Sequence, residues 1–467
     1  MTNKVVKRYE QWKRNVGVAS PFVIICGIIA VLYFIYRIVL VVSPAISFEQ
    51  SIFNPQTGSA VCHEEDDSSL KDPTPFLSNA YQTRVQKQPS LTPNLVKNAD
   101  LSLADQNTGG PVYYSHSVDD NGATYQYLKQ ASDGTVFLRV TNTEKRPAGQ
   151  TQPAWQIDPA TISDKPQTYA YSFWYRSTIS VHVSTEHTLP SGQTRYNDVM
   201  TLDPAPQWKQ FTAHFDNLDG ATSFRMDING VDAGQIDTRG YDIHQIPDAE
   251  LKEGIVSVTF DDGWQSIEDH AAPLLDKYGI KTTQYIISDF AATKTAGYMN
   301  FGTIQKLKQS GHEIGSHSLN HCNQIELPMS AVENNAVKSK QQLEDQKLGP
   351  VTTFAYPLGQ YNKATQDVYQ KTYPLIRSSD FGYNDRYFDE TDIHSVGVLN
   401  DTKDDEFKSW LEYAKVHRVW LVLVYHRVDE SGTYDVTTDQ LERQLKLIKA
   451  SGLKVLTMSD AASRARK

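Results

Sequence analysis

The sequence Ile255-Val-Ser-Val-Thr-Phe-Asp-Asp-Gly263 is the stretch that best indicates how this chain folds. Its apolar start predicts a buried strand over Ile255–Phe260, and Gly263 predicts a tight turn after it. Asp261 and Asp262 therefore lie at a strand end. Further elements are expected over Asp269–Tyr278 (helix), Lys281–Ile287 (strand), Phe301–Ser310 (helix), Trp420–Tyr425 (strand) and a last helix capped by Thr437 or Thr438. This alternation predicts parallel strands covered by helices, in a barrel or an open sheet.

Two histidines follow the acids along the chain, His317 and His321, at a spacing of i, i+4. On a helical turn this spacing places both imidazoles on one face. Together with Asp262 they offer three ligands to a zinc-like ion and leave a position open for water. Asp261 is then free to act as a base on that water, so the residues predict metal-assisted hydrolysis.

The segment from Asn94 to about Ile246 has an all-β pattern. Its aromatic residues alternate at period two, with Trp174 on the opposite face from Tyr169, Tyr171, Phe173 and Tyr175. Further short strands are expected over Thr178–Val183, Phe211–Phe215 and Phe224–Ile228, with a hairpin turn at Ser191-Gly192. The pattern predicts a two-sheet sandwich of the jelly-roll type. Tyr113, Tyr125 and Trp155 are candidates for stacking on sugar rings, although most aromatics in such domains belong to the core.

The N-terminal segment differs from the rest of the chain. Val16 to Tyr36 is an apolar run long enough to span a bilayer, and basic residues precede it. The positive-inside bias places the N-terminus in the cytoplasm and everything after Val42 outside. A cleaved signal peptide is the alternative, but the run is longer than a usual signal core and no A-x-A site follows. We therefore expect a single-pass protein of the cell membrane with an extracytoplasmic catalytic domain.

Charge and cysteine usage narrow the possible partners and compartments. The net charge of −10 over 467 residues argues against a nucleic-acid partner, which would require a basic surface. The three cysteines are Cys26, Cys62 and Cys322. A Cys62–Cys322 bridge is conceivable, but no framework spacing supports it, so unpaired thiols are expected.

Four motifs in the C-terminal part resemble, in order, those of polysaccharide deacetylases of the NodB-homology type, carbohydrate esterase family 4. They are Thr259-Phe-Asp-Asp-Gly263, His317-Ser-Leu-Asn-His321, Phe354-Ala-Tyr-Pro-Leu-Gly359 and Leu421-Val-Leu-Val-Tyr-His426. The resemblance covers residues 254–460 and implies a distorted (β/α) barrel with fewer strands than the usual eight, its active site at the C-terminal strand ends. The β segment before it resembles the jelly-roll carbohydrate-binding modules that often precede such catalytic domains.

The resemblance implies a role for each motif residue. Asp262, His317 and His321 would hold a divalent ion, with zinc first and cobalt, nickel or manganese as alternatives. Asp261 would be the general base toward an activated water, and a backbone N–H at Leu358 would stabilise the oxyanion. His426 would protonate the departing amine, with Tyr425 as packing beside it.

The third motif departs from the family pattern. Many members carry an arginine there that orients the catalytic base, whereas this chain has Ala355, and an aromatic residue is replaced by Leu358. We expect Arg377 to take over the orientation of Asp261.

The predicted protein is therefore multidomain. Its parts are a cytoplasmic stub and transmembrane anchor over 1–44, a flexible linker over 45–90, a β-sandwich accessory domain over 91–248 and a deacetylase domain over 249–467. The expected reaction is hydrolysis of N-acetyl groups on a polysaccharide such as peptidoglycan, a chitin-like chain or poly-N-acetylglucosamine. The alternatives are an O-acetyl esterase with the same site and a catalytically silent glycan-binding protein.

Overall fold

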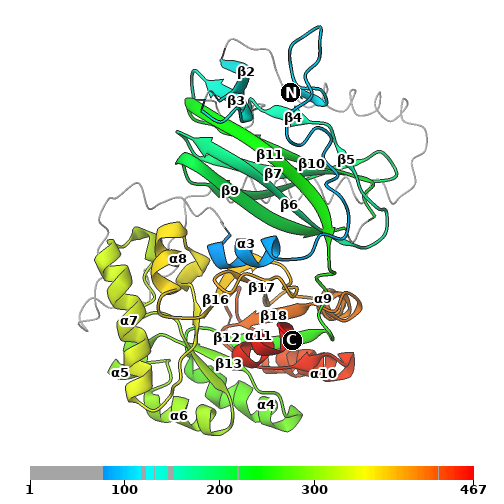
Figure 1. Ribbon diagram of the computed structural model, residues 1–467. Helices are drawn as coiled ribbons and strands as arrows, with labels where there is room; N and C mark the ends of the chain where they lie inside the picture. The colour runs from blue at the N-terminus through cyan, green and yellow to red at the C-terminus, as the bar shows by residue number, and fades with distance from the viewer. Residues whose placement is uncertain (1–76, 117–121, 131, 146–151, 218–219, 430) are drawn as a thin grey trace, which may run out of the picture. The chain divides into compact units, whose positions relative to one another are not determined.

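The computed structural model describes residues 77–116, 122–130, 132–145, 152–217, 220–429 and 431–467 (Figure 1). Within these ranges, no helix has the length and apolar character that crossing a membrane requires. The expected membrane segment over Val16 to Tyr36 lies outside the described residues.

The C-terminal part is a closed barrel of seven parallel strands. The ring runs in the order β12 (Ile255–Phe260), β13 (Thr283–Ile286), β14 (Glu313–Ser316), β15 (Thr353–Ala355), β16 (Leu375–Phe381), β17 (Ile393–Gly397) and β18 (Trp420–Tyr425). Pairing of β12 with both β13 and β18 closes it, and β19 (Lys454–Val455) pairs with the start of β12. The prediction of a (β/α) barrel with fewer than eight strands is confirmed.

Helices cover the outside of this ring (Figure 1). The helices and turns of this part are the π-helix η3 (Ile267–Ala271), the 3₁₀ turns η4 (Gln324–Glu326) and η5 (Pro357–Gly359), and α4 (Ala272–Tyr278), α5 (Ser288–Thr293), α6 (Phe301–Gln309), α7 (Met329–Asp345), α8 (Lys363–Tyr369), α9 (Asp404–Val416), α10 (Thr438–Ser451) and α11 (Met458–Ala465). The buried side chains of α11 pack with Ile255 and Trp420, in a cluster separate from the main core. Thr437 caps α10 by accepting a hydrogen bond from the Gln440 N–H, as predicted.

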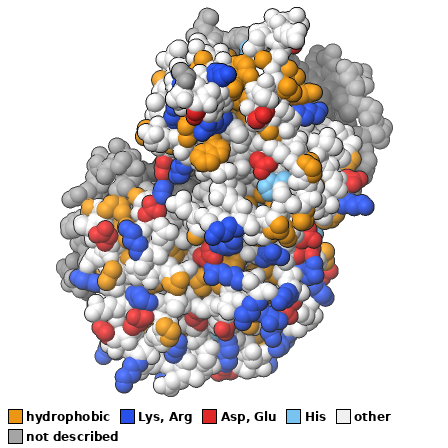
Figure 2. Space-filling view, in the orientation of Figure 1, with side chains coloured by type: hydrophobic (Ala, Val, Ile, Leu, Met, Phe, Trp, Pro, Cys, Tyr) orange, Lys and Arg blue, Asp and Glu red, His pale blue; other side chains and the backbone are white. Residues whose placement is uncertain are grey.

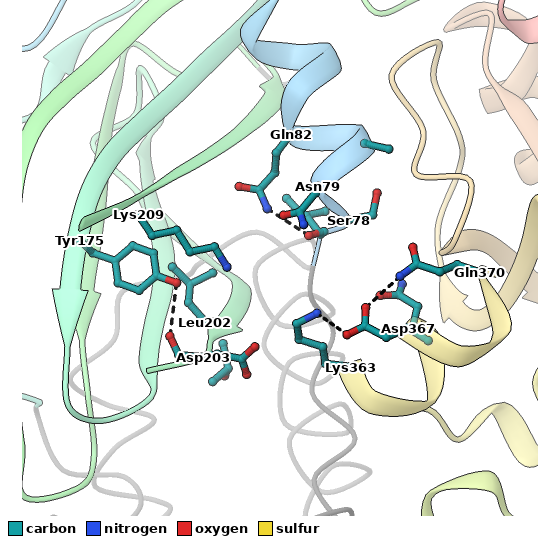
Figure 3. Close-up of a pocket in the computed structure, with 14 residues that line it drawn as sticks. Ser78, Asn79, Gln82, Tyr175, Leu202, Asp203, Lys209, Lys363, Asp367 and Gln370 are labelled. Carbon is teal, nitrogen blue, oxygen red and sulfur yellow. Dashed lines mark hydrogen bonds and ion pairs between the residues drawn. The ribbon is translucent and has the colours of Figure 1, made fainter. Parts of the chain in front are cut away.

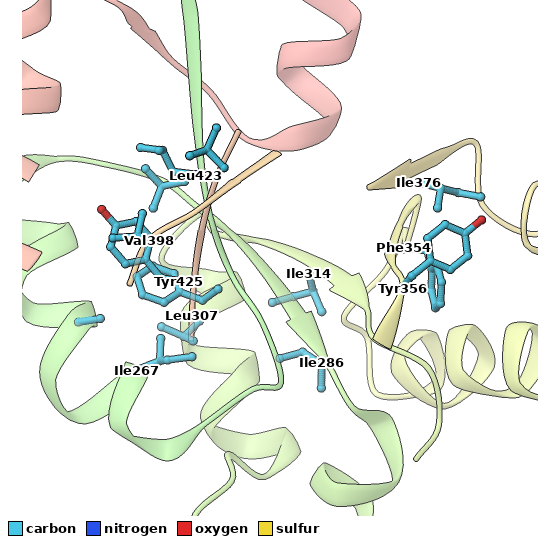
Figure 4. Close-up of a cluster of buried hydrophobic side chains, with 14 of the residues drawn as sticks. Ile267, Ile286, Leu307, Ile314, Phe354, Tyr356, Ile376, Val398, Leu423 and Tyr425 are labelled. Carbon is cyan, nitrogen blue, oxygen red and sulfur yellow. The ribbon is translucent and has the colours of Figure 1, made fainter. Parts of the chain in front are cut away.

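Alternation along β12 gives the strand two buried faces, which explains why it is mostly apolar. Its two polar residues, Ser257 and Thr259, are buried but hydrogen-bonded, Ser257 to the Trp420 indole and Thr259 to the Leu423 carbonyl. Val256, Val258 and Phe260 belong to the core that packs with the helices, part of which is drawn in Figure 4. Ile255 belongs to a second cluster with Tyr285 and Trp420. Because neither face meets water, the acids that follow the strand are held by a rigid support.

The preceding part consists of antiparallel sheets around a shared core. The five-stranded sheet has the order β2 (Ala123–Lys129), β3 (Val136–Asn142), β11 (Gly234–Ile246), β6 (Thr168–Ser177), β9 (Ala205–Asp216). The four-stranded sheet has the order β5 (Ala160–Thr161), β10 (Ser223–Asn229), β7 (Val181–Thr188), β8 (Thr194–Leu202), and β1 (Tyr114–His116) pairs with β4 (Trp155–Ile157). The period-two aromatics of β6 are buried in the core, as predicted. The expected strand at Thr178 begins later, at Val181.

The folded part begins earlier than the expected end of the linker at residue 90. Asn79–Gln86 forms the helix α3, whose first turn is capped by Ser78. Tyr81 and Val85 of this helix join the sandwich core, and Gln86 Nε2 donates to Thr212 Oγ1 at 2.9 Å. The linker prediction therefore needs correction here, because Tyr81 and Val85, one turn apart, are both buried in this core.

Cys322 is buried and disulfide-bonded, so the expectation of free thiols is wrong for this residue. The other two cysteines, Cys26 and Cys62, lie outside the described residues.

His312 is buried immediately before β14. Its Nδ1 accepts a hydrogen bond from the Thr282 N–H at 3.2 Å. Burial is the main cause that lowers the pKa of His312 to about 4, and the positive charge of Lys281 lowers it further. An unfolded histidine titrates near 6.5, so between about pH 6.5 and 4 only the unfolded chain takes up this proton. We expect the free energy of unfolding to fall by about 3 kcal/mol as the pH falls through this window. Urea unfolding at several pH values measures the slope, and His312→Asn should reduce it; an unchanged slope would contradict the assignment.

Candidate functional site

The two acids of the first motif lie where β12 ends. The Asp261 N–H continues the ladder by donating to the Tyr425 carbonyl at 2.9 Å. The chain then turns sharply, with φ +72° at Asp262 and φ +80° at Gly263. Left-handed backbone at a non-glycine residue costs of order 1–3 kcal/mol and is concentrated at functional sites. Because of this turn, the carboxylates of Asp261 and Asp262 contact different residues.

Asp262 faces the two histidines. Its Oδ1 lies 3.4 Å from His317 Nε2 and 3.2 Å from His321 Nε2. One ligand atom from each of the three residues fits within 4.8 Å of the others. The predicted trio is therefore brought together at one point.

The histidine pair is not on a helix, which corrects the sequence prediction. Both residues follow β14 in a turn in which Ser318 and His321 have φ of +66° and +61°. The Ser318 Oγ accepts the His321 N–H at 3.1 Å. A left-handed residue cannot continue an α-helix, so the turn brings the imidazoles together by a different route, with ring centroids 4.9 Å apart.

The donor set fits a divalent cation. His317 Nδ1 lies 2.8 Å from the Ala355 carbonyl, to which it donates, so that Nε2 is the ring nitrogen that faces Asp262. Asp262 Oδ1 is buried and accepts no well-oriented hydrogen bond from any described residue. The two imidazole nitrogens and the Asp262 oxygen that lacks a hydrogen-bond partner in the described part of the chain are a ligand set that zinc-like ions bind.

The second oxygen of Asp262 is held by Trp264, a residue that the sequence analysis did not single out. The indole Nε1 donates to Asp262 Oδ2 at 2.8 Å. The indole ring stacks on Tyr298 at 4.1 Å, and the Arg427 guanidinium lies 4.9 Å from its centroid. Burial raises the pKa of Asp262, but His321 and His317 outweigh it and hold that pKa well below its usual range. Asp262 is thus ionised and fixed in orientation.

Replacing Trp264 tests this support. Trp264→Phe keeps an aromatic ring against Tyr298 but removes the N–H donor to Asp262. Loss of such an outer hydrogen bond weakens metal binding by about 10–100-fold, which a competition titration with a chromophoric chelator measures. Trp410→Phe on α9 is the matched control and should leave the affinity unchanged. Equal affinities for the Trp264 variant and the parent chain would rule this role out.

Asp261 is paired with Arg377, as predicted. The Arg377 Nη2 donates to Asp261 Oδ2 at 2.5 Å, and both side chains are buried. Ala355 and Arg377 are direct partners on the neighbouring strands β15 and β16. Arg377 on β16 thus reaches the Asp261 carboxylate from the strand next to the one that carries Ala355.

His426 follows β18 and approaches the same carboxylate. Its Nε2 lies 4.0 Å from Asp261 Oδ2, and its Nδ1 is buried without a hydrogen-bond partner among the described residues. The exposed Tyr434 lies beside it, at a centroid distance of 5.3 Å. Tyr425 is packing, as expected, because it is buried and stacks on Phe260.

Leu358 lies in the turn η5 with φ +57° and an exposed side chain. Its N–H donates to no other group within the described part of the chain. The Leu358 N–H is therefore available as a hydrogen-bond donor.

Other predicted residues lie elsewhere. Trp155 is partly buried against the sandwich core and donates to the Arg139 carbonyl at 3.0 Å, and Tyr125 stacks on His116. Tyr113 is exposed, with Lys97 over its ring. A separate pocket, lined in part by Ser78, Tyr175, Lys209 and Lys363, is drawn in Figure 3. No predicted site residue lines this pocket, so we assign it no part in the chemistry.

Comparison with known proteins places the sequence similarity in the barrel. Residues 248–373 match the polysaccharide deacetylase family. The Bacillus subtilis protein YxkH is 28% identical over 172 residues, which are 36% of this chain and 60% of the relative. Peptidoglycan-N-acetylglucosamine deacetylase PgdA of Listeria monocytogenes is 26% identical over 122 residues, which are 26% of this chain and 25% of the relative. The match thus spans less than two thirds of either relative.

Solved structures give a similar result at lower identity. The Streptococcus pyogenes deacetylase PplD matches with a TM-score of 0.32 and 22% identity, over 33% of this chain and 68% of that one. A Bacillus anthracis pseudoenzyme of carbohydrate esterase family 4 matches with a TM-score of 0.35 and 17% identity, over 45% and 66% of the two chains. The sequence similarity to polysaccharide deacetylases rests on residues 248–373, which include both acids and both histidines.

Proposed function

We propose that this protein is a metal-dependent deacetylase that removes N-acetyl groups from hexosamine units of an exported polysaccharide. The observation that carries the proposal is the convergence of Asp262, His317 and His321 beside a second carboxylate, Asp261, that Arg377 holds in place. The similarity of residues 248–373 to polysaccharide deacetylases supports it.

Each residue has a distinct part in the proposed reaction. Asp262, His317 and His321 hold the divalent cation, which supplies Lewis acidity at the acetyl carbonyl and toward water. Asp261 takes a proton from the attacking water as the new C–O bond forms, and the Leu358 N–H donates to the developing oxyanion. His426 gives a proton to the nitrogen as the C–N bond breaks, because an amine leaves poorly unless protonated. The products are acetate and a free amino sugar.

The compartment is also part of the proposal. We place the catalytic barrel outside the cytoplasm, anchored by the apolar segment that begins at Val16. The disulfide at Cys322 supports this placement, since such bonds persist in oxidising compartments. The candidate substrates are peptidoglycan, chitin-like chains and poly-N-acetylglucosamine.

Acetate release by the full-length chain tests the function, with N-acetylglucosamine oligomers, peptidoglycan, a chitin-like chain and poly-N-acetylglucosamine as substrates. The protein is first treated with a chelator and then reloaded with zinc, cobalt, nickel or manganese, with Asp261→Asn as the control. We expect activity only after reloading, and a loss of about 10²–10⁴-fold in the control. Bound metal without acetate release from any of the three candidate polymers would overturn the proposal.

His426→Ala separates amide from ester hydrolysis. An amide needs the acid more than an ester does, because its leaving group must be protonated. The proposed N-deacetylase should lose far more activity on N-acetylglucosamine oligomers than on an acetyl ester. Equal losses on both substrates would argue for an O-acetyl esterase.

A further inference from the structure

The face of the five-stranded sheet opposite the sandwich core carries a continuous stack of aromatic rings and guanidinium groups. We call it the arginine–tryptophan ladder; its members are Phe137, Arg139, Trp174, Arg176, Trp208 and Arg239. The strand register explains the arrangement, since Arg139, Asp237 and Arg176 pair across β3, β11 and β6, and Arg239 pairs with Trp174. Trp174 is the ladder's exposed aromatic, with 37% of its surface accessible.

The stacking distances show that the ladder is preformed. The Arg176 guanidinium lies 5.4 Å from the Phe137 centroid and 4.8 Å from that of Trp208. Arg239 lies 4.3 Å from the Trp208 centroid and 5.9 Å from that of Trp174. Such contacts hold long side chains in place before any ligand arrives.

Two of the three arginines have a counter-charge and the third does not. Asp237 is fully buried and accepts two bonds from each of Arg139 and Arg176. Within the described residues, Arg239 makes no hydrogen bond or ion pair, and its Nε is buried without a partner. Arg239 also acts on the acid Asp133, whose pKa is lowered mainly by the Thr135 N–H and to a smaller extent by the charge of Arg239.

The backbone next to Arg239 leaves room for the side chains of Arg239 and Trp174. A β-bulge separates Arg239 from Asp242, and Gly240 within it has φ +59°. A Cβ at Gly240 would lie only 3.2 Å from Trp174 Cδ1. A larger residue would therefore crowd the indole and carry a strained backbone.

We propose that the ladder binds a carboxylate-bearing polysaccharide. An arginine without a counter-ion presents a planar fork that matches a carboxylate, and the indole of Trp174 offers an apolar face to a pyranose ring. The three arginines exceed the single Asp237 on a chain whose net charge is −10. On the face drawn in Figure 2, acidic and basic side chains are interspersed. An acidic polymer is therefore repelled by the protein as a whole and attracted at this place.

Calorimetric titration of the full-length chain with polygalacturonate tests the proposal, with the methyl-esterified polymer as the uncharged match. Neither polymer carries N-acetyl groups, so the result does not depend on the proposed deacetylase activity. We expect the acidic form to bind at least tenfold more tightly than its ester, and its affinity to fall as salt rises. Equal affinity for the two forms, or no binding of the acidic form at low salt, would overturn the proposal.

Variants locate the site. Arg239→Gln should weaken binding at least tenfold, and Arg239→Lys at least threefold, because an ammonium keeps the charge but loses the fork. Trp174→Ala should weaken binding about fivefold. Tyr196→Ala, an exposed aromatic on the other sheet, is the control and should change it less than twofold. Unchanged affinity in both Arg239 variants, with thermal unfolding like that of the parent chain, would show that the ladder only packs the sheet.

Discussion

Arg377→Ala should lower the rate of acetate release by about 10²-fold and the free energy of unfolding by about 3–5 kcal/mol. Both effects have one physical origin. The guanidinium is the counter-charge of the buried Asp261 carboxylate, which it contacts at 2.5 Å. Its removal leaves an uncompensated charge inside the barrel and frees the carboxylate to rotate away from the reacting water.

Two further variants make this prediction sharper. Arg377→Lys keeps the charge and should recover most of the stability but only part of the rate, because an ammonium does not hold a carboxylate in one plane. Adding Asp261→Asn to Arg377→Ala should restore stability without restoring activity, since the buried charge is then gone. Urea unfolding and acetate release measure the two quantities separately. If Arg377→Ala kept full rate and full stability, Arg377 would have no orienting role.

His317→Ala should abolish metal binding and lower the rate by about 10³-fold or more. A bound cation supplies several kcal/mol of transition-state stabilisation, and each 1.36 kcal/mol is a factor of ten. The substitution also removes the contact to the Ala355 carbonyl. His270→Ala is the control, because His270 is half-exposed and belongs to none of the possible metal clusters found in the described residues.

Metal content and thermodynamic linkage provide readouts independent of turnover. At a free zinc concentration 100 times the dissociation constant, the parent chain should gain about 2.7 kcal/mol of stability. The His317 variant should gain almost none and retain almost no zinc after gel filtration. Stoichiometric zinc in this variant would contradict the assignment of His317 as a ligand.

The sequence predicts those barrel strands well that have a clear apolar pattern. β12 and β18 have the predicted bounds, because a strand buried on both faces is mostly apolar. Asp262, His317 and His321 meet as expected, since the carboxyl ends of parallel strands share one edge of the barrel. The turn at Ser318 and His321 was not predictable, because an i, i+4 spacing fits both a helix and a left-handed turn.

Most of the remaining differences between the sequence predictions and the structure come from contacts between residues that are distant in sequence. The pairing of Trp264 with Asp262 depends on an indole held against Tyr298. The helix α3 packs against a sheet whose strands come later in the sequence. The spacing of the cysteines along the chain does not predict the disulfide at Cys322. Arg377 was predictable only because a known motif lacked its arginine.

The closure of the barrel has a consequence for its dynamics. β12 is hydrogen-bonded to β13, β18 and β19, so it has no free edge from which to fray. The amide protons of Val256, Val258 and Phe260 should then exchange with deuterium only when the whole barrel unfolds. Active-site elements are often among the first to open, but here the strand that carries both acids should be among the last. Catalytic positioning at Asp261 and Asp262 would thus persist through local opening elsewhere in the chain.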